Sequence, residues 1–246
     1  MTHILITGAA SGIGRAAALT LAGDGTRLTL IDRDASGLDA LMAERTGGDW
    51  HAVPMDVSDP EAWAALDLGD VPLTGTVISA GISDAAPITE MSFRDWRRVL
   101  SINLDGAFLA LQTALRHAAA GASVVAVSSA TGKKAVPNTA AYGASKAALS
   151  QLVKVAALEA APRQIRVNAI APGGVKTPMF SNLSVFKELV AIHGDEEAAW
   201  SAMAVETPLQ RFSEPSEMAA LIGFLLGPEA ASITGAVLDC DGGYGV

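Results

Sequence analysis

Tyr142 and Lys146 stand four positions apart in the stretch Tyr-Gly-Ala-Ser-Lys. On a helix, residues at this spacing share one face, so both side chains can act on the same small molecule. A free tyrosine keeps its proton up to about pH 10, and a neighbouring ammonium group favours the phenolate and lowers that pKa. Ser129 follows an apolar, strand-like run and could bring a hydroxyl group to the same point. These residues predict proton transfer to or from a substrate oxygen.

A glycine-rich turn lies near the start of the chain, where the sequence from Thr7 reads T-G-A-A-S-G-I-G. Glycines at such a junction allow a tight turn and let a pyrophosphate approach the N-terminus of the following helix. The spacing G-x-x-x-G-x-G differs from the commoner G-x-G-x-x-G. Its position after the first strand of an alternating pattern favours dinucleotide binding over an ordinary turn. The predicted cofactor-binding residues here are Gly8, Ser11, Gly12, Ile13 and Gly14.

Asp32 ends the second predicted strand, about twenty residues beyond the glycine turn, where an acidic residue accepts hydrogen bonds from the adenosine ribose. A carboxylate at this point repels a 2′-phosphate, so NAD is favoured over NADP. Arg33 follows directly and could pair with such a phosphate. We interpret Arg33 as a surface or stacking side chain of the cofactor site, because Asp32 occupies the ribose position.

Two further pairs follow predicted strands and complete the expected cofactor site. Asp56 and Val57 come after the third strand, where a carboxylate and an apolar side chain could hold the edge and the face of an adenine. Ala80 and Gly81 come after the fourth strand, where small residues allow the cofactor to approach the backbone closely.

Short β-rich runs alternate with longer amphipathic runs and would position these residues. The predicted strands cover residues 3–7, 27–32, 50–55, 76–80, 123–128, 165–170 and 236–239. The predicted helices cover about residues 12–22, the stretch from the second strand to about residue 45, and residues 60–66, 93–117 and 142–160. This alternation predicts an α/β fold, a doubly wound Rossmann-type sheet of seven parallel strands with helices on both faces. Short connections without a Pro/Gly/Ser linker predict a single domain over residues 1–246.

Residues 177–214 do not fit the alternation and contain two helical pieces, 183–192 and 196–203. An insertion after the carboxyl end of a strand would lie over the ligand crevice of a doubly wound sheet, so we predict a lid. Its apolar side chains most often pack on the body of a protein, but some should face the substrate. The substrate-facing candidates are Met179, Phe180, Phe186 and Met203, and they favour an apolar or ring-containing substrate.

Composition excludes several classes of partner. The chain has 246 residues, 50% hydrophobic and 17% charged, with a net charge of -9 and no basic stripe, which disfavours nucleic-acid binding. The longest apolar run, 218–226, is too short for a bilayer. The single cysteine and a strand-like start that leaves no room for a signal peptide predict a cytoplasmic protein. The four histidines are scattered, so no metal site is expected.

Jointly, these motifs resemble the short-chain dehydrogenase/reductase family over nearly the whole chain. The matching residues are Gly8-x-x-x-Gly12-x-Gly14, Asp32, Asp56, Ala80-Gly81, Asn103-Leu-Asp-Gly106, Ser129, Tyr142-x-x-x-Lys146 and Pro172-Gly173-x-x-x-Thr177. The resemblance implies that Tyr142 is the catalytic acid/base and that Lys146 holds the nicotinamide ribose and lowers the tyrosine pKa. It implies that Ser129, rather than Ser128, binds the substrate oxygen.

The resemblance also implies that Asn103 anchors a water molecule linking Lys146 to solvent. The nicotinamide contacts it implies are Pro172, Gly173, Val175 and Thr177. One departure concerns the family's Asn-Asn-Ala-Gly, which reads Ile-Ser-Ala-Gly here, with Ser79 in place of a structural asparagine. We expect a local rewiring of hydrogen bonds at this point without loss of activity.

The predicted function is NAD(H)-dependent interconversion of a secondary alcohol and a ketone. One alternative is an NADPH-dependent 3-oxoacyl-carrier-protein reductase, which would prefer a basic residue near Ser11. Another is a non-catalytic dinucleotide-binding regulator, which would typically lose the tyrosine or the lysine. The helix after Tyr142 is apolar on more than one face, and the resemblance implies a homotetramer (or dimer) with this helix and the strand near Val237 at interfaces.

Overall fold

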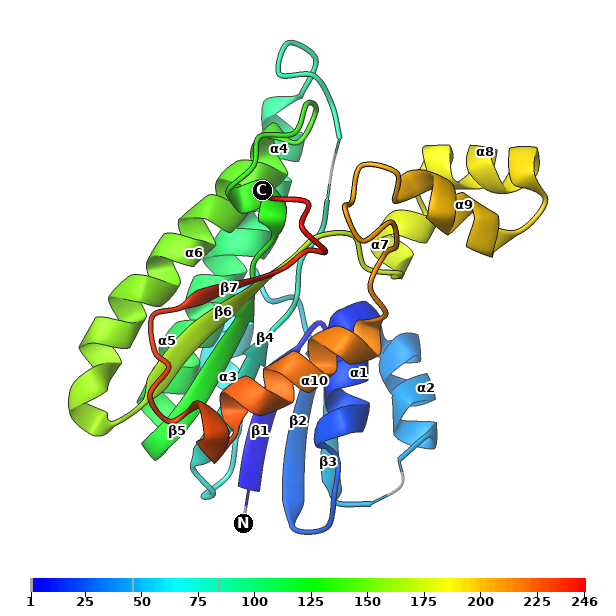
Figure 1. Cartoon of the computed structure of the whole chain (residues 1–246). Helices are drawn as coiled ribbons and strands as arrows, with labels where there is room; N and C mark the ends of the chain where they lie inside the picture. The colour runs from blue at the N-terminus through cyan, green and yellow to red at the C-terminus, as the bar shows by residue number, and fades with distance from the viewer. Residues whose placement is uncertain (1, 46, 84) are drawn as a thin grey trace.

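The computed structural model describes residues 2–45, 47–83 and 85–246, in which one parallel sheet runs in the order β3-β2-β1-β4-β5-β6-β7 (Figure 1). Its seven strands are β1 (Thr2–Thr7), β2 (Thr26–Asp32), β3 (Asp49–Pro54), β4 (Leu73–Ile78), β5 (Ala118–Val127), β6 (Arg166–Pro172) and β7 (Val237–Cys240). The strand order reverses between β1 and β4, and ligands of such sheets bind beyond the carboxyl ends of the strands at this point. The predicted doubly wound α/β fold is confirmed.

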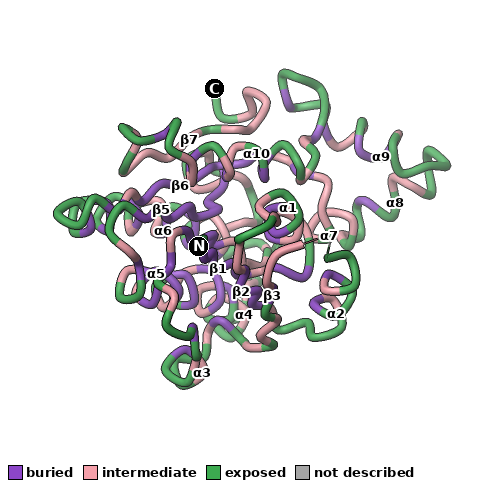
Figure 2. Tube along the Cα trace, turned by 90° about the horizontal axis from the view of Figure 1, so that it is seen from below, coloured by how far each residue is buried: buried purple, intermediate pink, exposed green. Residues whose placement is uncertain are grey.

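Helices cover both faces of the sheet (Figure 1). They are α1 (Gly12–Leu21), α2 (Ala35–Ala43), α3 (Pro60–Ala65), α4 (Phe93–Leu100), α5 (Gly106–His117), α6 (Ala140–Ala160) and α10 (Pro215–Leu226). Alternate residues of β1 enter different cores, because successive strand side chains point to opposite faces. Leu5 packs in the cluster that holds Leu149 of α6, whereas Ile6 packs in the cluster that holds Leu38 of α2 and Ile222 of α10. The middle of the sheet is buried on both sides (Figure 2).

Two helical features differ from the sequence expectation. The single helix expected over 93–117 is interrupted by a π-helical turn, Ser101–Asp105, between α4 and α5. Such a turn accommodates an extra residue and frequently marks a functional site. The apolar run 218–226, for which the sequence predicts no element, forms most of α10, whose residues Ile222 and Leu225 are fully buried. None of the described helices combines the length and the hydropathy that a bilayer crossing requires.

The segment α7–α9 stands apart from the sheet (Figures 1 and 2). It consists of α7 (Pro178–Ser181), α8 (Ser184–His193) and α9 (Glu196–Met203). A small core of its own joins Phe186 of α8 to Trp200 of α9, with ring centroids 4.2 Å apart. Phe212, in the return to α10, completes this core and lies 5.4 Å from the Trp200 ring. The segment therefore has a packing unit that is separate from the two cores of the sheet.

Candidate active site

A cavity of about 970 Å³ lies at the carboxyl ends of the central strands, where most of the predicted site residues meet. Of the predicted cofactor and catalytic residues it is lined by Gly8, Ser11, Gly12, Ile13, Asp32, Arg33, Asp56, Val57, Ala80, Gly81, Ser129, Tyr142, Lys146, Pro172, Gly173, Val175 and Thr177. Gly14, Asn103 and Phe186 are absent from its lining. Segments that are distant in the sequence therefore converge on one site.

The glycine turn lies so close to its surroundings that side chains are excluded. Gly8 adopts a φ of 69°, and a Cβ atom there would lie 2.8 Å from the Ala80 backbone nitrogen. A Cβ atom on Gly14 would lie 2.1 Å from the Gly8 carbonyl oxygen. On the far side of the turn, a Cβ atom on Gly12 would lie 3.2 Å from Cγ2 of Thr177. The turn is thus packed between β4 and the end of β6, with backbone groups facing the cavity.

The tie between β1 and β4 comes from Thr7. Its hydroxyl oxygen accepts hydrogen bonds from the backbone N–H groups of Ser79 and Ala80, at 3.1 and 3.2 Å. This side chain therefore ties the end of β1 to the backbone at Ser79 and Ala80, and the rewiring expected at Ser79 stays a prediction. Because Thr7 fixes the backbone directly after β4, it also fixes the position at which Ala80 and Gly81 line the cavity.

Asp32 is held at the mouth of the glycine turn by two backbone hydrogen bonds. Its Oδ2 accepts from the Ala10 N–H and its Oδ1 from the Asp34 N–H, both at 3.0 Å. Asp34, which is not among the residues predicted from the sequence, also lines the cavity, and its side chain caps α2 by accepting from the Gly37 N–H. The sequence signal was the second acid of Asp-Arg-Asp. Two carboxylates therefore face this end of the cavity.

Arg33 is exposed and lies among carboxylates. Hydrogen bonds from Ser58 hold the pKa of Asp56 below its usual range, and the Arg33 charge adds a smaller effect in the same direction. The Arg33 charge likewise contributes last to lowering the pKa of Asp34, after the hydrogen bonds from Ser36 and Gly37. The positive charge of Arg33 is thus partly offset by its neighbours.

Tyr142 lies in the first turn of α6, and Ser129 caps a short 3-10 helix (Ala130–Gly132) after β5. Burial raises the pKa of the Tyr142 phenol, and a hydrogen bond with Ser129 acts in the opposite direction. Ser128 points elsewhere, since its hydroxyl donates to the Lys146 carbonyl oxygen at 3.0 Å. Of the two serines, Ser129 is the one that meets the phenol.

Lys146 is 3% exposed and its Nζ donates to the Val127 carbonyl oxygen at 2.8 Å. The ammonium nitrogen lies 5.7 Å from the centroid of the Tyr142 ring. Burial lowers the pKa of Lys146 to about 8. The net shift of the Tyr142 pKa is upward in this structure, because desolvation of the phenol outweighs the hydrogen bond with Ser129. The expected effect of Lys146 on this pKa stays a prediction.

Asn103 is fully buried in the π-helical turn and joins the loop after β4 to α6. Its Oδ1 accepts from the Ile82 N–H at 2.8 Å, and its Nδ2 donates to the Ile82 carbonyl oxygen at 2.9 Å and to Ser145 Oγ at 3.1 Å. A Cβ atom on Gly81 would lie 3.4 Å from both Asn103 Oδ1 and Lys146 Nζ. The amide and the ammonium group therefore approach the same point beneath Gly81.

The segment after β6 contains the residues that are expected to contact a nicotinamide. A Cβ atom on Gly173 would lie 2.9 Å from the Asp241 carbonyl oxygen, so glycine permits the close approach of the C-terminal segment. A Cβ atom on Gly174 would lie 2.4 Å from the Phe212 ring. Val175 is buried, and its carbonyl oxygen accepts from Thr177 Oγ1 at 3.2 Å. The backbone path past the cavity is therefore fixed by close packing.

The structure corrects one of the four substrate-facing candidates. Met179, Phe180 and Met203 line the cavity, whereas Phe186 is 2% exposed and packs against Trp200 inside the α7–α9 core. Helical periodicity does not distinguish a side chain that packs within the segment from one that faces the cavity.

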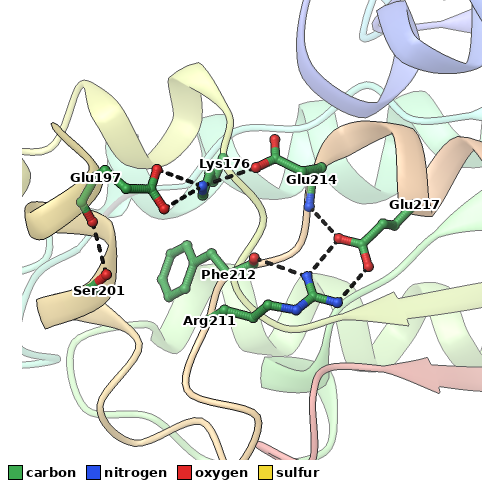
Figure 3. Close-up of polar contacts among 7 residues, drawn as sticks. All are labelled: Lys176, Glu197, Ser201, Arg211, Phe212, Glu214 and Glu217. Atoms are coloured by element: carbon green, nitrogen blue, oxygen red, sulfur yellow. Dashed lines mark hydrogen bonds and ion pairs between the residues drawn. The ribbon is translucent and has the colours of Figure 1, made fainter.

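An ion-pair network connects α9 to the body beside this segment (Figure 3). Lys176 Nζ lies 2.9 Å from Glu197 of α9 and 3.0 Å from Glu214 before α10. Hydrogen bonds to these two carboxylates raise the pKa of Lys176. Arg211 forms a two-pronged pair with Glu217 of α10, with both nitrogen–oxygen distances 2.7 Å. Lys176 is thus the side chain that ties the outer helices to the strand end.

We expect the exchange Glu197→Gln to raise the substrate KM, because the predicted lid would close over the substrate less often. The increase should be about two- to five-fold, since an exposed ion pair contributes less than about 1 kcal/mol. Steady-state kinetics at low and high salt measure this, and salt should raise the wild-type KM towards that of the variant. Glu196→Gln, on the adjacent exposed carboxylate, is the matched control; equal KM values for the two variants would contradict the role of the tie.

Comparisons with known proteins agree with this geometry. A family model described as enoyl-(acyl carrier protein) reductase matches residues 8–245. Cis-4-hydroxycyclohexanecarboxylate dehydrogenase of Sinomonas cyclohexanicum is 37% identical over 252 residues, covering 98% of this chain and 95% of that protein. Galactitol 2-dehydrogenase (L-tagatose-forming) of Cereibacter sphaeroides is 38% identical over 248 residues, covering 98% and 94%. The crystal structure of a short chain dehydrogenase family protein from Francisella tularensis subsp. tularensis SCHU S4 has a TM-score of 0.88 at 28% identity, covering 99% and 98%.

A doubly wound sheet with this cavity and these similarities defines a nicotinamide-dependent oxidoreductase acting on alcohol and ketone groups. The chain belongs to the short-chain dehydrogenase/reductase family.

Proposed function

We propose that the protein is an NAD(H)-dependent dehydrogenase that interconverts a secondary alcohol and a ketone, on an apolar or ring-containing substrate. One observation carries the proposal: the Tyr142 phenol, hydrogen-bonded to Ser129 and close to buried Lys146, lines the same cavity as the glycine turn and Asp32. A proton-transferring group and a dinucleotide-binding turn thus share one space. Met179, Phe180 and Met203 supply the apolar wall.

The residues present fit a nicotinamide dinucleotide. The glycine turn exposes backbone groups where a Cβ atom would clash, and Asp32 presents a fixed carboxylate. When bound, the nicotinamide supplies the hydride acceptor or donor. Ser129 donates a hydrogen bond to the substrate oxygen, and Tyr142 takes the hydroxyl proton in oxidation or returns it in reduction. The Lys146 ammonium group favours the phenolate and holds the ribose. We propose that Asn103 completes a water-mediated path for the proton.

The test of this function is oxidation of a panel of secondary alcohols with NAD, followed by absorbance at the NADH band. NADH should form with at least one cyclic or apolar secondary alcohol. A non-catalytic regulator would bind NADH and produce no turnover with any member of the panel, and that result would refute the proposal. The 3-oxoacyl-carrier-protein reductase alternative is supported by the 36% identity over 247 residues to the 3-oxoacyl-[acyl-carrier-protein] reductase FabG of Thermotoga maritima, and it requires NADPH with acyl-thioester substrates.

The preference for NAD rests on Asp32, and it yields a second expected result. We expect kcat/KM to favour NADH over NADPH by about a hundred-fold, since two like charges about 4 Å apart near a protein surface repel each other by about 4 kcal/mol. Asp32→Ser should raise kcat/KM for NADPH at least about ten-fold, because Arg33 can then pair with the phosphate. Asp39→Asn, an exposed acid of α2 outside the cavity, is the control. A wild-type preference for NADPH would contradict the assignment.

We also propose a homotetramer (or dimer) in the cytoplasm. Leu158 of α6 is 78% exposed, and Val155 of α6 and Phe108 of α5 are 42% and 46% exposed. An exposed apolar stripe of this kind is typical of an interface. Light scattering of the purified chain measures the assembly, and a monomer would contradict it. The single cysteine supports a reducing compartment.

A further inference from the structure

Two polar side chains that the proposed reaction does not use line the same cavity as Tyr142. Glu206 lies in the turn after α9, and Tyr244 lies near the C-terminus. The two segments are joined, since the Leu209 N–H donates to the Gly242 carbonyl oxygen at 3.1 Å. A Cβ atom on Gly242 would lie 2.8 Å from Thr207 Cγ2, so the segments are in close contact. They form one continuous piece of the cavity wall.

Tyr244 is held in place by Lys134. The Lys134 Nζ donates to the Tyr244 carbonyl oxygen at 2.6 Å and lies 4.0 Å from the centroid of its ring. The Tyr244 N–H donates to the Asp241 carbonyl oxygen at 3.2 Å, closing a turn. Both the backbone and the ring are therefore restrained, whereas the phenol hydroxyl makes no hydrogen bond to any residue that the structure describes. Tyr244 thus brings to the cavity lining a restrained ring whose hydroxyl group has no partner in the described part of the chain.

Glu206 brings a negative charge to the same wall. Its carboxylate has no ion pair or hydrogen bond with the described part of the chain. Burial raises the pKa of the Tyr244 phenol, and the charge of Glu206 raises it further, so the two groups are electrostatic neighbours. The phenol therefore stays neutral and can donate a hydrogen bond. The nearby Lys134 is already committed to Tyr244.

This pair selects one kind of ligand. A carboxylate accepts hydrogen bonds from hydroxyl groups and repels anions, and a neutral phenol both donates and accepts. The ring of Tyr244 and the apolar wall of Met179, Phe180 and Met203 suit C–H surfaces. We propose that Glu206 and Tyr244 bind a second hydroxyl group of the substrate, and that the substrate is an uncharged alcohol with at least two hydroxyl groups on an otherwise apolar ring or chain. This inference rests on the proposed function.

The experiment compares matched substrates that differ by one group. Cyclohexanol, 1,2-cyclohexanediol and 4-hydroxycyclohexanecarboxylate share a ring, and 2-butanol and 2,3-butanediol share a chain. In the wild type, kcat/KM for each diol should exceed that for its mono-alcohol by about ten- to a hundred-fold, the effect of one hydrogen bond to a charged group. The carboxylate should be the poorest substrate of the ring series.

The variants Glu206→Gln and Tyr244→Phe should each reduce the advantage of the diols about five-fold or more. Oxidation of the mono-alcohols should stay within about two-fold, because the added hydroxyl group alone loses its partner. Glu206→Gln should also raise kcat/KM for the carboxylate substrate, since the repulsion is removed. Glu196→Gln removes one negative charge from the neighbouring helix α9 outside the cavity, and it should leave all the ratios unchanged.

Equal kcat/KM values for diols and mono-alcohols in the wild type would overturn the inference. It would also be overturned if Glu206→Gln changed kcat/KM for diols and mono-alcohols by the same factor. If mono-alcohols are oxidised but the ratio of kcat/KM between diol and mono-alcohol is near one, the proposed function still holds. If no alcohol is oxidised, calorimetric titration of the protein–NADH complex with 1,2-cyclohexanediol and cyclohexanol still tests the site. Tighter binding of the diol, weakened by Glu206→Gln, supports the inference, and equal binding refutes it.

Discussion

The exchange Tyr142→Phe is expected to lower turnover by about a hundred- to ten-thousand-fold, which is the usual contribution of a positioned acid or base. Phenylalanine keeps the ring but removes the hydroxyl group that the proton must reach, and Ser129 loses its hydrogen-bond partner. The ring sits in the first turn of α6, where its packing needs no hydroxyl group. NADH affinity should therefore remain within about two-fold. Steady-state kinetics and fluorescence titration with NADH measure the two quantities.

Gln151→Ala is the control for a change on the same helix, because this residue is exposed and lies outside the cavity. It should leave kcat, KM and NADH affinity unchanged. Turnover by Tyr142→Phe that stays near the wild-type rate would refute the assignment of Tyr142 as the acid/base. A parallel loss of NADH binding or of thermal stability would show that the ring is structural instead.

The rate of the reaction should depend on pH, with opposite directions for oxidation and reduction. Burial raises the pKa of Tyr142 above the ordinary tyrosine value of about 10, so the phenolate becomes more abundant as the pH rises through the alkaline range. Alcohol oxidation needs the phenolate and should accelerate with rising pH, whereas ketone reduction needs the phenol and should slow. The residual activity of Tyr142→Phe should lack this dependence. Profiles of kcat/KM in both directions test the assignment independently of the absolute rate.

The second large effect is expected for Gly14→Ala, which should abolish measurable NADH binding and lower the free energy of unfolding by several kcal/mol. The new methyl group would lie 2.1 Å from the Gly8 carbonyl oxygen, so the turn must move away from α1. The backbone of Gly8 has little room to move, because it packs so closely on the segment after β4 that a Cβ atom there would lie 2.8 Å from the Ala80 backbone nitrogen. Overpacking at rigid backbone is among the few single changes with effects this large.

Gly223→Ala is a matched control, because Gly223 is also a helix glycine. A Cβ atom there would lie 3.9 Å from its nearest neighbour, a Leu21 methyl group, which is an ordinary contact. Alanine in a helix interior is favoured over glycine by about 0.5–1 kcal/mol, so this variant should be as stable as the wild type or slightly more stable. Thermal unfolding and NADH titration compare the two. Normal NADH affinity in Gly14→Ala would show that the turn does not hold the cofactor.

Local spacing of residues in the sequence was enough to predict the fold class and many residues of the candidate site. Alternating strand and helix periods specify a doubly wound sheet, because each period fixes which residues can share a buried face. A tyrosine and a lysine four residues apart share a helix face wherever that helix lies. Likewise, a glycine turn or an acid at a strand end occupies a defined place relative to the sheet. For these residues, chain-local geometry and the rule for parallel sheets suffice, and the structure brings them into one cavity.

Contacts between distant segments could not be predicted from local sequence spacing. Phe186 and Met203 look alike in the sequence, but only packing against Trp200 turns Phe186 inward. The π-helical turn at Asn103 depends on partners in α6 and after β4. Glu206 and Tyr244 carry no local motif, and both line the cavity because the C-terminal segment packs on the turn after α9. The upward pKa shift of Tyr142 could not be derived from the sequence, since burial depends on everything that surrounds the ring. Burial and long-range contact are properties of the assembled chain, and the chemistry of the site depends on both.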